Sequence, residues 1–197
     1  MGLVNERFLS FNQLIPLSKV QLYISGVAGL GRKIQILVIG SSGTHCSEHE
    51  CQLAYEIGCE VARHHAVLVT GGLGGVMEAA SKGARENDGL TVGIIPQDDA
   101  KFANQYCEIV IPTGIGWARD FLTAYSADAV IVIGGGAGTA IETHVAYMKS
   151  KPIVALEGSG GFADSVADSY LDNRKLVKVT KEKEPKRAVE RALQMAK

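Results

Sequence analysis

The sequence has few aromatic residues, almost no net charge and no long apolar run, and each shortage excludes a class of partner. Phe, Trp and Tyr make up 6% of the 197 residues, so extended platforms for stacking nucleic-acid bases are not expected. A net charge of −1 gives no general attraction to nucleic acids or anionic membranes. No run approaches the roughly 18 consecutive apolar residues of a membrane-spanning helix. We therefore expect neither nucleic-acid nor membrane partners.

Signals for export and for disulfide or metal cross-links are also missing. The N-terminus has no charged region followed by a long apolar stretch, and Pro16 interrupts its most apolar part. No Cys-x-x-Cys pair occurs, and a chain of this length buries a core without disulfides. His45, Cys46, His49 and Cys51 lie close together, but a helix expected to start at Ser47 separates them. We expect reduced cysteines, no metal site and a cytoplasmic location.

The chain divides into a short N-terminal extension and one domain. Residues 1–32 show no clear hydrophobic period, except that residues 20–24 alternate, which indicates an edge strand or a disordered extension. From Lys33 onward, short apolar runs alternate with helical patterns, so we expect one domain over residues 33–197. Ser47-x-x-Glu50 is typical of a capping box at a helix start.

Seven short apolar segments predict strands. They are residues 36–39, 66–69, 91–95, 109–111, 129–133, 152–156 and 177–179. Because helical patterns separate them almost throughout, including residues 116–126, 138–149 and 186–197, the sheet is expected to be mainly parallel. The sequence therefore predicts a three-layer, doubly wound α/β domain of the Rossmann-like kind. In such a fold the strand ends meet at one edge, where ligands bind.

Three glycine-rich loops are expected at that edge. The third, residues 134–138, leaves a strand and opens a helix, whose free N–H groups and dipole suit a phosphate. Glu142 follows about one helical turn later. The residues that we expect to bind a phosphate or nucleotide are Gly40, Ser41, Ser42, Gly71, Gly72, Gly74, Gly75, Met77, Gly135, Gly136, Ala137, Gly138 and Thr139.

These loops do not match the common nucleotide motifs. No Gly-Lys-Ser/Thr occurs, which excludes the phosphate-binding P-loop. Gly134-x-Gly136-x-x reaches Thr139 where the dinucleotide fingerprint has glycine. A classical ATP or NAD site is therefore disfavoured.

The loops resemble those of the Lonely-Guy-type Rossmannoid superfamily, long mislabelled lysine decarboxylase. Its Pro-Gly-Gly-x-Gly-Thr-x-x-Glu motif matches residues 134–142, except that Gly134 replaces the proline. Its upstream arginine corresponds to Arg119, and its glycine-rich turn followed by methionine corresponds to residues 71–77. The resemblance covers about residues 33–180. No pyridoxal-phosphate lysine motif is recognisable, so true lysine decarboxylation is not expected.

The resemblance implies one of two functions. Lonely-Guy enzymes hydrolyse the N-glycosidic bond of nucleoside 5′-monophosphates such as AMP and need no cofactor. The resemblance would make Glu142 and Arg119 the catalytic residues. Glu142 would be the acid, base or cation-stabilising carboxylate, and Arg119 would position the substrate. The His and Lys beside the family's arginine are absent, since Trp117 and Asp120 lie in that segment. This variant is closer to a branch that includes the molybdenum cofactor carrier protein, which binds a phosphorylated pterin without turning it over.

Both functions predict a small phosphorylated ligand: a nucleotide monophosphate, phosphate or molybdenum cofactor. The resemblance further implies a homodimer or higher homo-oligomer, with the helices that carry Arg119 and Glu142 near the interface. A third class, DNA handling, occurs in the superfamily, but the net charge of −1 weighs against it.

Several other residues leave two interpretations open. Glu78 faces either the site or solvent, and Trp117 either stacks on a ligand or anchors a dimer. Asn104 and Tyr106 either contact a base or pterin or belong to a plain loop. His64 and His65 are expected to complement a helix dipole. Residues 181–186 are expected to form a solvated linker and helix start.

Overall fold

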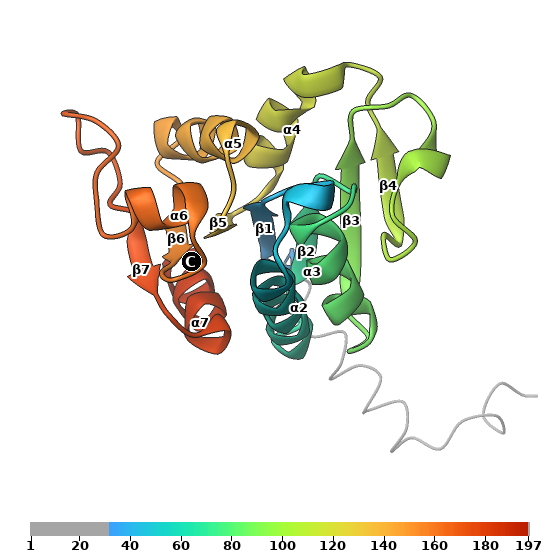
Figure 1. The fold of residues 1–197 in the computed structure, drawn as a ribbon, viewed down its shortest axis with the longest axis horizontal. Helices are drawn as coiled ribbons and strands as arrows, with labels where there is room; N and C mark the ends of the chain where they lie inside the picture. Colours follow the sequence, from blue (N-terminus) through green and yellow to red (C-terminus); the bar gives the residue numbers. More distant parts are fainter. Residues whose placement is uncertain (1–31, 197) are drawn as a thin grey trace, which may run out of the picture. The chain divides into compact units, whose positions relative to one another are not determined.

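A seven-stranded parallel sheet lies at the centre of the computed structural model, which describes residues 32–196 (Figure 1). The strand order is β4-β3-β2-β1-β5-β6-β7, and every neighbouring pair is parallel. The strands are β1 (Gln35–Gly40), β2 (Val67–Thr70), β3 (Leu90–Ile95), β4 (Ile109–Pro112), β5 (Ala129–Ile133), β6 (Ile153–Leu156) and β7 (Thr180–Glu182). The prediction for the N-terminal extension lies outside the described residues, apart from Arg32.

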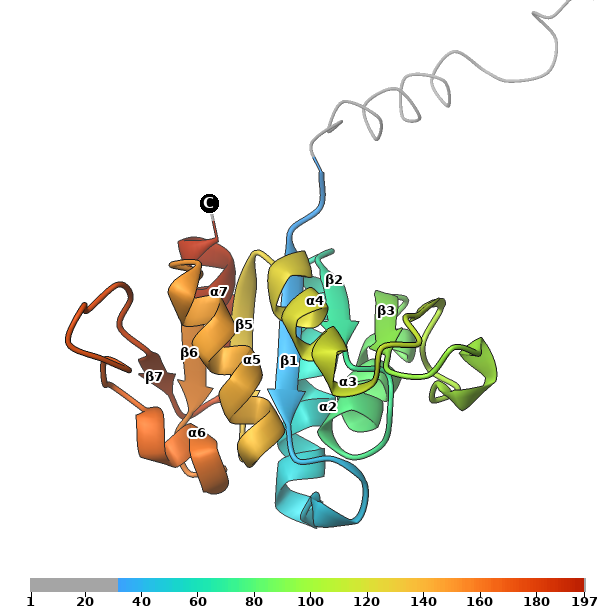
Figure 2. The ribbon, with the colours of Figure 1, turned by 90° about the horizontal axis from the view of Figure 1, so that it is seen from above.

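Helices cover both faces of the sheet, and in Figure 2 α4 and α5 lie in front of the strands. One layer holds α2 (Glu48–Arg63), α3 (Val76–Arg85) and α7 (Pro185–Met195). The other holds α4 (Arg119–Ser126), α5 (Ala137–Met148) and α6 (Gly161–Val166). Single 3₁₀ turns lie at Gly43–His45, Ala100–Phe102 and Gly116–Ala118. The predicted three-layer, doubly wound α/β fold is confirmed.

The sheet separates two apolar cores. In β5 every residue is buried, and alternate side chains point to opposite faces. Ile131 and Ile133 join the core under α2, α3 and α7, whereas Val130 and Val132 join the core under α5 and α6. Continuous apolar runs of this kind are typical of parallel strands that are buried on both sides. Among the described residues, no helix is long and apolar enough to cross a membrane.

The chain order reverses at β1, which lies between β2 and β5. The loops after β1 and β5 therefore lead away from each other toward opposite layers. Such a topological switch point is where open α/β sheets bind ligands. The loop after β1 leads to α2, and the loop after β5 leads to α5.

The last strand begins three residues later than predicted, at Thr180. Residues 177–179 are not part of the sheet: Lys178 forms an isolated antiparallel bridge with Tyr170. The sheet is instead completed by β7, which pairs with β6. Val179 is fully buried in the core under α5 and α6, so its apolar character reflects burial rather than strand pairing. The capping box at Ser47 and Glu50 is confirmed.

Candidate functional site

A pocket of about 350 Å³ lies at the switch point. Its walls come from the end of β1, the glycine loop after β5, the start of α5 and the start of α4. The lining residues are Ile39, Gly40, Ser41, Ser42, His45, Gly71, Met77, Trp117, Arg119, Asp120, Gly135, Gly136, Ala137, Gly138, Thr139 and Glu142. Most of the predicted site residues therefore line one cavity.

The floor of the pocket contains the N-terminus of α5. Gly136 is the N-cap residue and makes no side-chain cap hydrogen bond. The first-turn N–H groups of a helix have no intrahelical acceptor, and here they belong to Ala137, Gly138 and Thr139. The Thr139 hydroxyl donates to the carbonyl oxygen of Gly40 at 3.2 Å, which joins the helix to β1. An uncapped helix start that lines a pocket favours an anionic ligand.

The glycine loop takes a backbone conformation that other residues rarely adopt. Gly134 has φ +52° and Gly135 has φ +87°. A Cβ atom on Gly134 would lie 1.7 Å from Oε1 of Glu50. Proline, which the resembling superfamily has at this position, fixes φ near −65° and cannot take this conformation. The N–H groups of Phe162 and Ala163 in α6 donate to the carbonyls of this loop at 2.9 Å.

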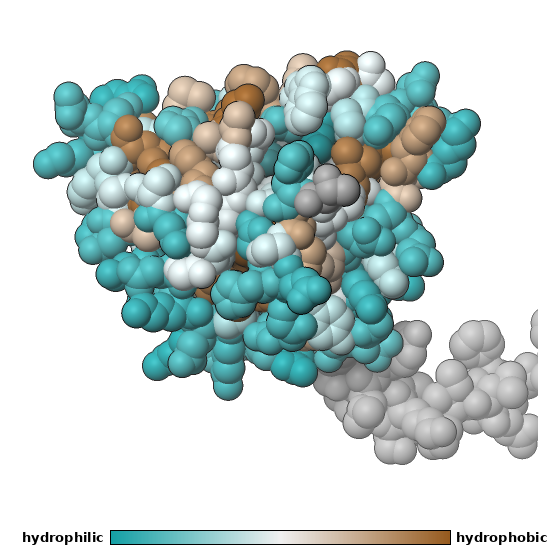
Figure 3. Space-filling view, viewed as in Figure 1, coloured by the Kyte–Doolittle hydropathy of each residue, from teal (hydrophilic) through white to brown (hydrophobic). Residues whose placement is uncertain are grey.

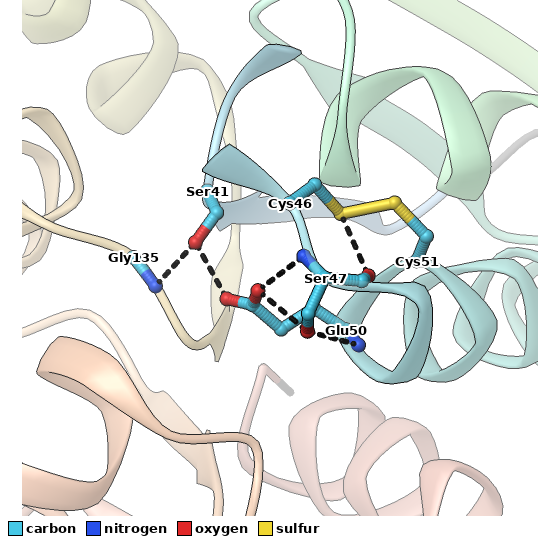
Figure 4. Close-up of a disulfide and its surroundings, with 6 residues drawn as sticks. All are labelled: Ser41, Cys46, Ser47, Glu50, Cys51 and Gly135. Atoms are coloured by element: carbon cyan, nitrogen blue, oxygen red, sulfur yellow. Dashed lines mark hydrogen bonds between the residues drawn. A yellow bond between two sulfur atoms is a disulfide. The ribbon is translucent and has the colours of Figure 1, made fainter. Parts of the chain in front are cut away.

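A hydrogen-bonded relay connects the start of α2 to the glycine loop (Figure 4). The Ser41 hydroxyl donates to Glu50 Oε1 at 2.5 Å and accepts from the Gly135 N–H at 3.0 Å. The other Glu50 oxygen accepts from the backbone and hydroxyl of Ser47. Burial acts to raise the pKa of Glu50, but the hydrogen bonds from Ser41, Ser47 and Gly135 outweigh it and lower the pKa. An ionised Glu50 therefore fixes the loop.

Three charged side chains meet where α4 and α5 line the pocket. Arg119 Nη1 lies 2.9 Å from Asp120 Oδ1 and 3.5 Å from Glu142 Oε1. The Thr123 hydroxyl donates to Glu142 Oε1 at 2.5 Å. All three charged residues are buried, and even Glu142 is only 7% exposed. Sequence reasoning missed Asp120 as a site residue, because its neighbour Arg119 carries the resemblance and an acidic residue beside it gives no motif signal.

Burial controls the protonation of both carboxyl groups. It raises the pKa of Glu142 to about 7, while the hydrogen bond from Thr123 and the charge of Arg119 act to lower it and the charge of Asp120 acts to raise it. Burial also raises the pKa of Asp120, against the lowering effect of Arg119. Near neutral pH, Glu142 can both donate and accept a proton.

Close packing places the Arg119 guanidinium. A Cβ atom on Gly71 would lie 2.7 Å from both Nη1 and Nη2 of Arg119 and from the sulfur of Met77. Only glycine at this position lets the guanidinium lie against the backbone. Within residues 32–196, the buried Nε of Arg119 has no hydrogen-bond partner. Buried donors are almost always satisfied, so this N–H is an exception among the described residues.

The rest of the second glycine loop packs behind the site. Gly72, Gly74 and Gly75 do not line the pocket. Gly75 has φ +74°, and a Cβ atom there would lie 2.5 Å from the Ser41 carbonyl oxygen. Asn104 braces this loop, since its backbone N–H donates to the Gly72 carbonyl and its side chain donates to the Leu73 carbonyl. Of the two interpretations, contact with a base or pterin and a place in a plain loop, the hydrogen bonds of Asn104 support the structural one.

The cysteines differ from the expectation of four reduced thiols. Cys46 and Cys51 form a disulfide, whereas Cys59 and Cys107 are free. The spacing of the bonded pair across a helix start gives no sequence signal for this cross-link, since it depends on the path of the preceding loop. Across the part of the chain that the structure describes, no group of His, Cys, Asp and Glu residues could hold a metal ion. His45 and Trp117 line the pocket, and Glu78 does not.

The raised pKa of Glu142 predicts a specific pH dependence of stability. The folded protein holds this proton more tightly than the unfolded chain, whose pKa is near 4.5. The resulting stabilisation is complete below about pH 4.5 and is lost as the pH rises through about 7. Between pH 5 and pH 8, we expect the free energy of unfolding of the native chain to fall by roughly 2 kcal/mol more than that of Glu142→Gln. Urea unfolding at both pH values measures this, and parallel changes in the two proteins would contradict it.

Comparison with known proteins agrees with this geometry. The pattern of the SLOG cluster4 family matches residues 33–189. Over 132 residues, 62% of this chain and 69% of the relative, the sequence is 35% identical to the cytokinin riboside 5′-monophosphate phosphoribohydrolase of Mycobacterium tuberculosis. The solved Moco carrier protein of Chlamydomonas rheinhardtii is 32% identical with a TM-score of 0.72, and 84% of this chain and 98% of that chain are covered.

A second solved structure is similar in the same way. The molybdenum cofactor binding protein of the phototrophic bacterium Rippkaea orientalis is 30% identical with a TM-score of 0.71, over 84% of this chain and 99% of that chain.

Fold and pocket together define a Rossmann-like α/β domain with a cavity at its switch point. The chain belongs to the SLOG cluster4 family. The predicted resemblance to Lonely-Guy-type proteins, in a branch near the molybdenum cofactor carrier, is confirmed.

Proposed function

We propose that this chain binds a nucleoside 5′-monophosphate and hydrolyses its N-glycosidic bond. The observation that carries the proposal is that Glu142, Arg119 and the uncapped start of α5 line one pocket. Water and the substrate would give the free base and ribose 5-phosphate. The similarity to a phosphoribohydrolase of Mycobacterium tuberculosis supports this substrate class.

The phosphate belongs at the start of α5. There the N–H groups of Ala137, Gly138 and Thr139 provide donors, and Ser42 lines the same pocket with its hydroxyl. Asp120 offsets the charge of Arg119 at 2.9 Å. The attraction for the anion therefore comes mainly from the helix dipole and backbone N–H groups.

Glu142 is the group suited to the chemical step. Cleavage of an N-glycosidic bond passes through an oxocarbenium-like state, which a nearby carboxylate stabilises. A carboxylate can also take the proton of the attacking water, and a pKa near the working pH makes this transfer efficient. The pKa of Glu142, raised by burial to about 7, meets that condition. Arg119 and Thr123 hold the carboxylate in place.

The test is a direct assay of the purified chain. AMP, GMP, CMP and UMP are incubated with it, and free base and ribose 5-phosphate are measured by chromatography. We expect release of base from at least one monophosphate, and none from the matching nucleoside, since the nucleoside lacks the phosphate that α5 binds. Absence of base from every monophosphate would overturn the hydrolase proposal.

The Arg119–Asp120 ion pair favours a second candidate, a carrier that binds a phosphorylated ligand without chemistry. An arginine already paired with Asp120 has less charge to offer a transition state. The solved relatives named for the molybdenum cofactor support a phosphorylated pterin as this ligand. Native mass spectrometry of the chain mixed with molybdopterin tests it. A retained pterin without base release supports the carrier, and base release without pterin binding contradicts it.

We also propose that the chain forms a homodimer through α4 and α5. These helices pack together and expose apolar side chains on their outer side. The exposed residues are Phe121, Leu122, Tyr125, Ile141 and Met148, together with Trp117 in the 3₁₀ turn before α4. Figure 3 shows hydrophobic residues along the upper edge of the molecule, over α4 and α5. Trp117 is 80% exposed and also lines the pocket, so a second copy here would border the ligand. An apolar patch of this kind is typical of a protein interface.

Substitution of one apolar residue tests this interface. Because a charge in the centre of an apolar contact loses its hydration, Phe121→Glu is expected to raise the dimer dissociation constant roughly 30-fold. Leu176→Glu, at an exposed leucine outside α4 and α5, should leave it unchanged. Light scattering after size exclusion gives the mass at several concentrations. A native chain that stays monomeric, or equal behaviour of both variants, contradicts the proposal.

A further inference from the structure

The disulfide between Cys46 and Cys51 lies across the start of α2 and next to the pocket (Figure 4). Cys46 precedes the N-cap residue Ser47, and Cys51 lies in the first turns of the helix. The Cα atoms are 6.1 Å apart, within the usual range for a disulfide. Both cysteines are half-buried, and the residues between them are exposed except Glu50. A small reductant can therefore reach the bond.

The same segment forms a wall of the pocket. Ser41, Ser42 and His45 line the cavity, and His45 is bonded directly to Cys46. This wall contains the 3₁₀ turn Gly43–His45, which is closed by two backbone hydrogen bonds. The His45 N–H donates to the Ser42 carbonyl, and the Cys46 N–H donates to the Gly43 carbonyl. The turn has no side-chain cap. The disulfide ties the end of this wall to α2.

The wall is attached to the rest of the site at its two ends. At one end, Ser41 bonds to Glu50 and to the Gly135 N–H. At the other end, Cys46 is bonded to Cys51, one residue beyond Glu50. The disulfide and the hydrogen-bonded relay therefore meet in the same turn of α2. Loss of the disulfide leaves the wall held by Ser41, by the capping box at Ser47 and by local backbone bonds.

We propose that Cys46 and Cys51 are a reversible redox site that controls this pocket wall. In the disulfide state the wall is fixed against α2 and the pocket is ready to bind. Reduction by a dithiol frees residues 42–46, so that the pocket is formed for only part of the time. The effect on ligand affinity rests on the proposed phosphate site, whereas the effect on the wall does not.

The exchange needs only a dithiol reductant. One of its thiolates attacks a protein sulfur, forms a mixed disulfide and displaces the other cysteine as a thiolate, which takes up a proton. The second thiol of the reductant then attacks the mixed disulfide and releases the first cysteine. Two electrons and two protons pass to the protein, and the reductant leaves as a disulfide. A small-molecule disulfide carries out the reverse reaction.

The two free cysteines provide a matched control. Burial raises the pKa of the Cys59 thiol and of the Cys107 thiol, and the protonated form of a thiol reacts poorly. Neither residue lines the pocket. Cys107→Ser should therefore keep the full response to a dithiol, whereas Cys46→Ser and Cys51→Ser should abolish it.

The first measurement is hydrogen–deuterium exchange of the full chain, oxidised and after treatment with dithiothreitol. We expect amides of residues 42–46 to exchange at least about threefold faster after reduction, while those of β5 are unchanged. In Cys46→Ser, exchange should be fast with or without dithiothreitol. Equal exchange in the two states of the native chain, or a response in Cys46→Ser like that of the native chain, would overturn the redox site.

The second measurement is calorimetric binding of AMP and of inorganic phosphate to the same samples. A wall that is formed for about a third of the time raises the dissociation constant about threefold. If the oxidised and reduced chains bind equally although residues 42–46 exchange faster after reduction, the disulfide does not control ligand affinity. Faster exchange with no binding of either anion in either state would support the redox site and contradict the phosphate site, so the two proposals fail in different ways.

Discussion

Glu142→Gln is expected to lower kcat/KM for nucleoside monophosphate hydrolysis by about 10²- to 10⁴-fold. The amide keeps the size of the side chain and can still accept from the Thr123 hydroxyl, which now lies 2.5 Å from the carboxylate. It cannot take a proton or carry the negative charge that stabilises an oxocarbenium-like state. Steady-state assays over a range of AMP concentrations measure the loss.

Binding separates this effect from damage to the pocket. The proposed phosphate donors belong to the start of α5 and to the β1 loop, so the dissociation constant of AMP should change by less than about threefold. Glu78→Gln is the matched control, because Glu78 does not line the pocket and its variant should retain the native rate. A Glu142→Gln protein within threefold of the native rate would rule out Glu142 as the catalytic group.

Gly134→Ala is expected to destabilise the fold and to weaken phosphate binding. At φ +52°, an alanine costs roughly 1–2 kcal/mol. Its Cβ atom would also occupy the position of the Glu50 carboxylate, 1.7 Å away. Displacing Oε1 of Glu50 breaks its charged hydrogen bond from Ser41, which is worth roughly 1.5–3 kcal/mol. We expect a loss of roughly 3–5 kcal/mol in the free energy of unfolding, measured by urea denaturation.

Gly138→Ala is the control for this substitution. Gly138 lies in the first turn of α5 without a positive φ, and a Cβ atom added there would meet nothing within 4 Å. Alanine favours a helix over glycine by up to about 1 kcal/mol, so its stability should equal or exceed that of the native chain. Equal stability of Gly134→Ala and the native chain would show that the relay through Glu50 does not hold the loop.

The fold could be predicted because each strand can be recognised from its own short segment of sequence. A buried parallel strand must be apolar on both faces, so segments such as residues 129–133 stand out from the amphipathic helices around them. The alternation of strand and helix then limits the topology. The failure at residues 177–179 has the same origin, because Val179 is buried in the core without belonging to a strand of the sheet.

The site could be predicted only where a motif marks it. Residues 135–139 and Glu142, which line the pocket, are found from the spacing of glycines before a helix. Glu50 is predicted as a helix cap, but the hydrogen bond that its other oxygen accepts from the Ser41 hydroxyl is missed. That contact depends on how the start of α2 lies beside β1. Asp120 is missed for a similar reason, since its role comes from burial beside Arg119. Contacts made between elements are not encoded in any one segment.

The hydrogen bonds that join the end of β1 to the loop after β5 and to α5 have a consequence for when the pocket forms during folding. Ser41 and Gly135 are 94 residues apart in sequence, and Gly40 and Thr139 are 99 apart. Contacts of such high sequence separation form only after most of the loop-closure entropy has been overcome. A chain that has emerged only as far as β4 contains the β1 wall of the pocket but not α4 or α5. The pocket is therefore complete only after the two halves of the sheet have joined, so the proposed ligand would bind finished molecules and not partial ones.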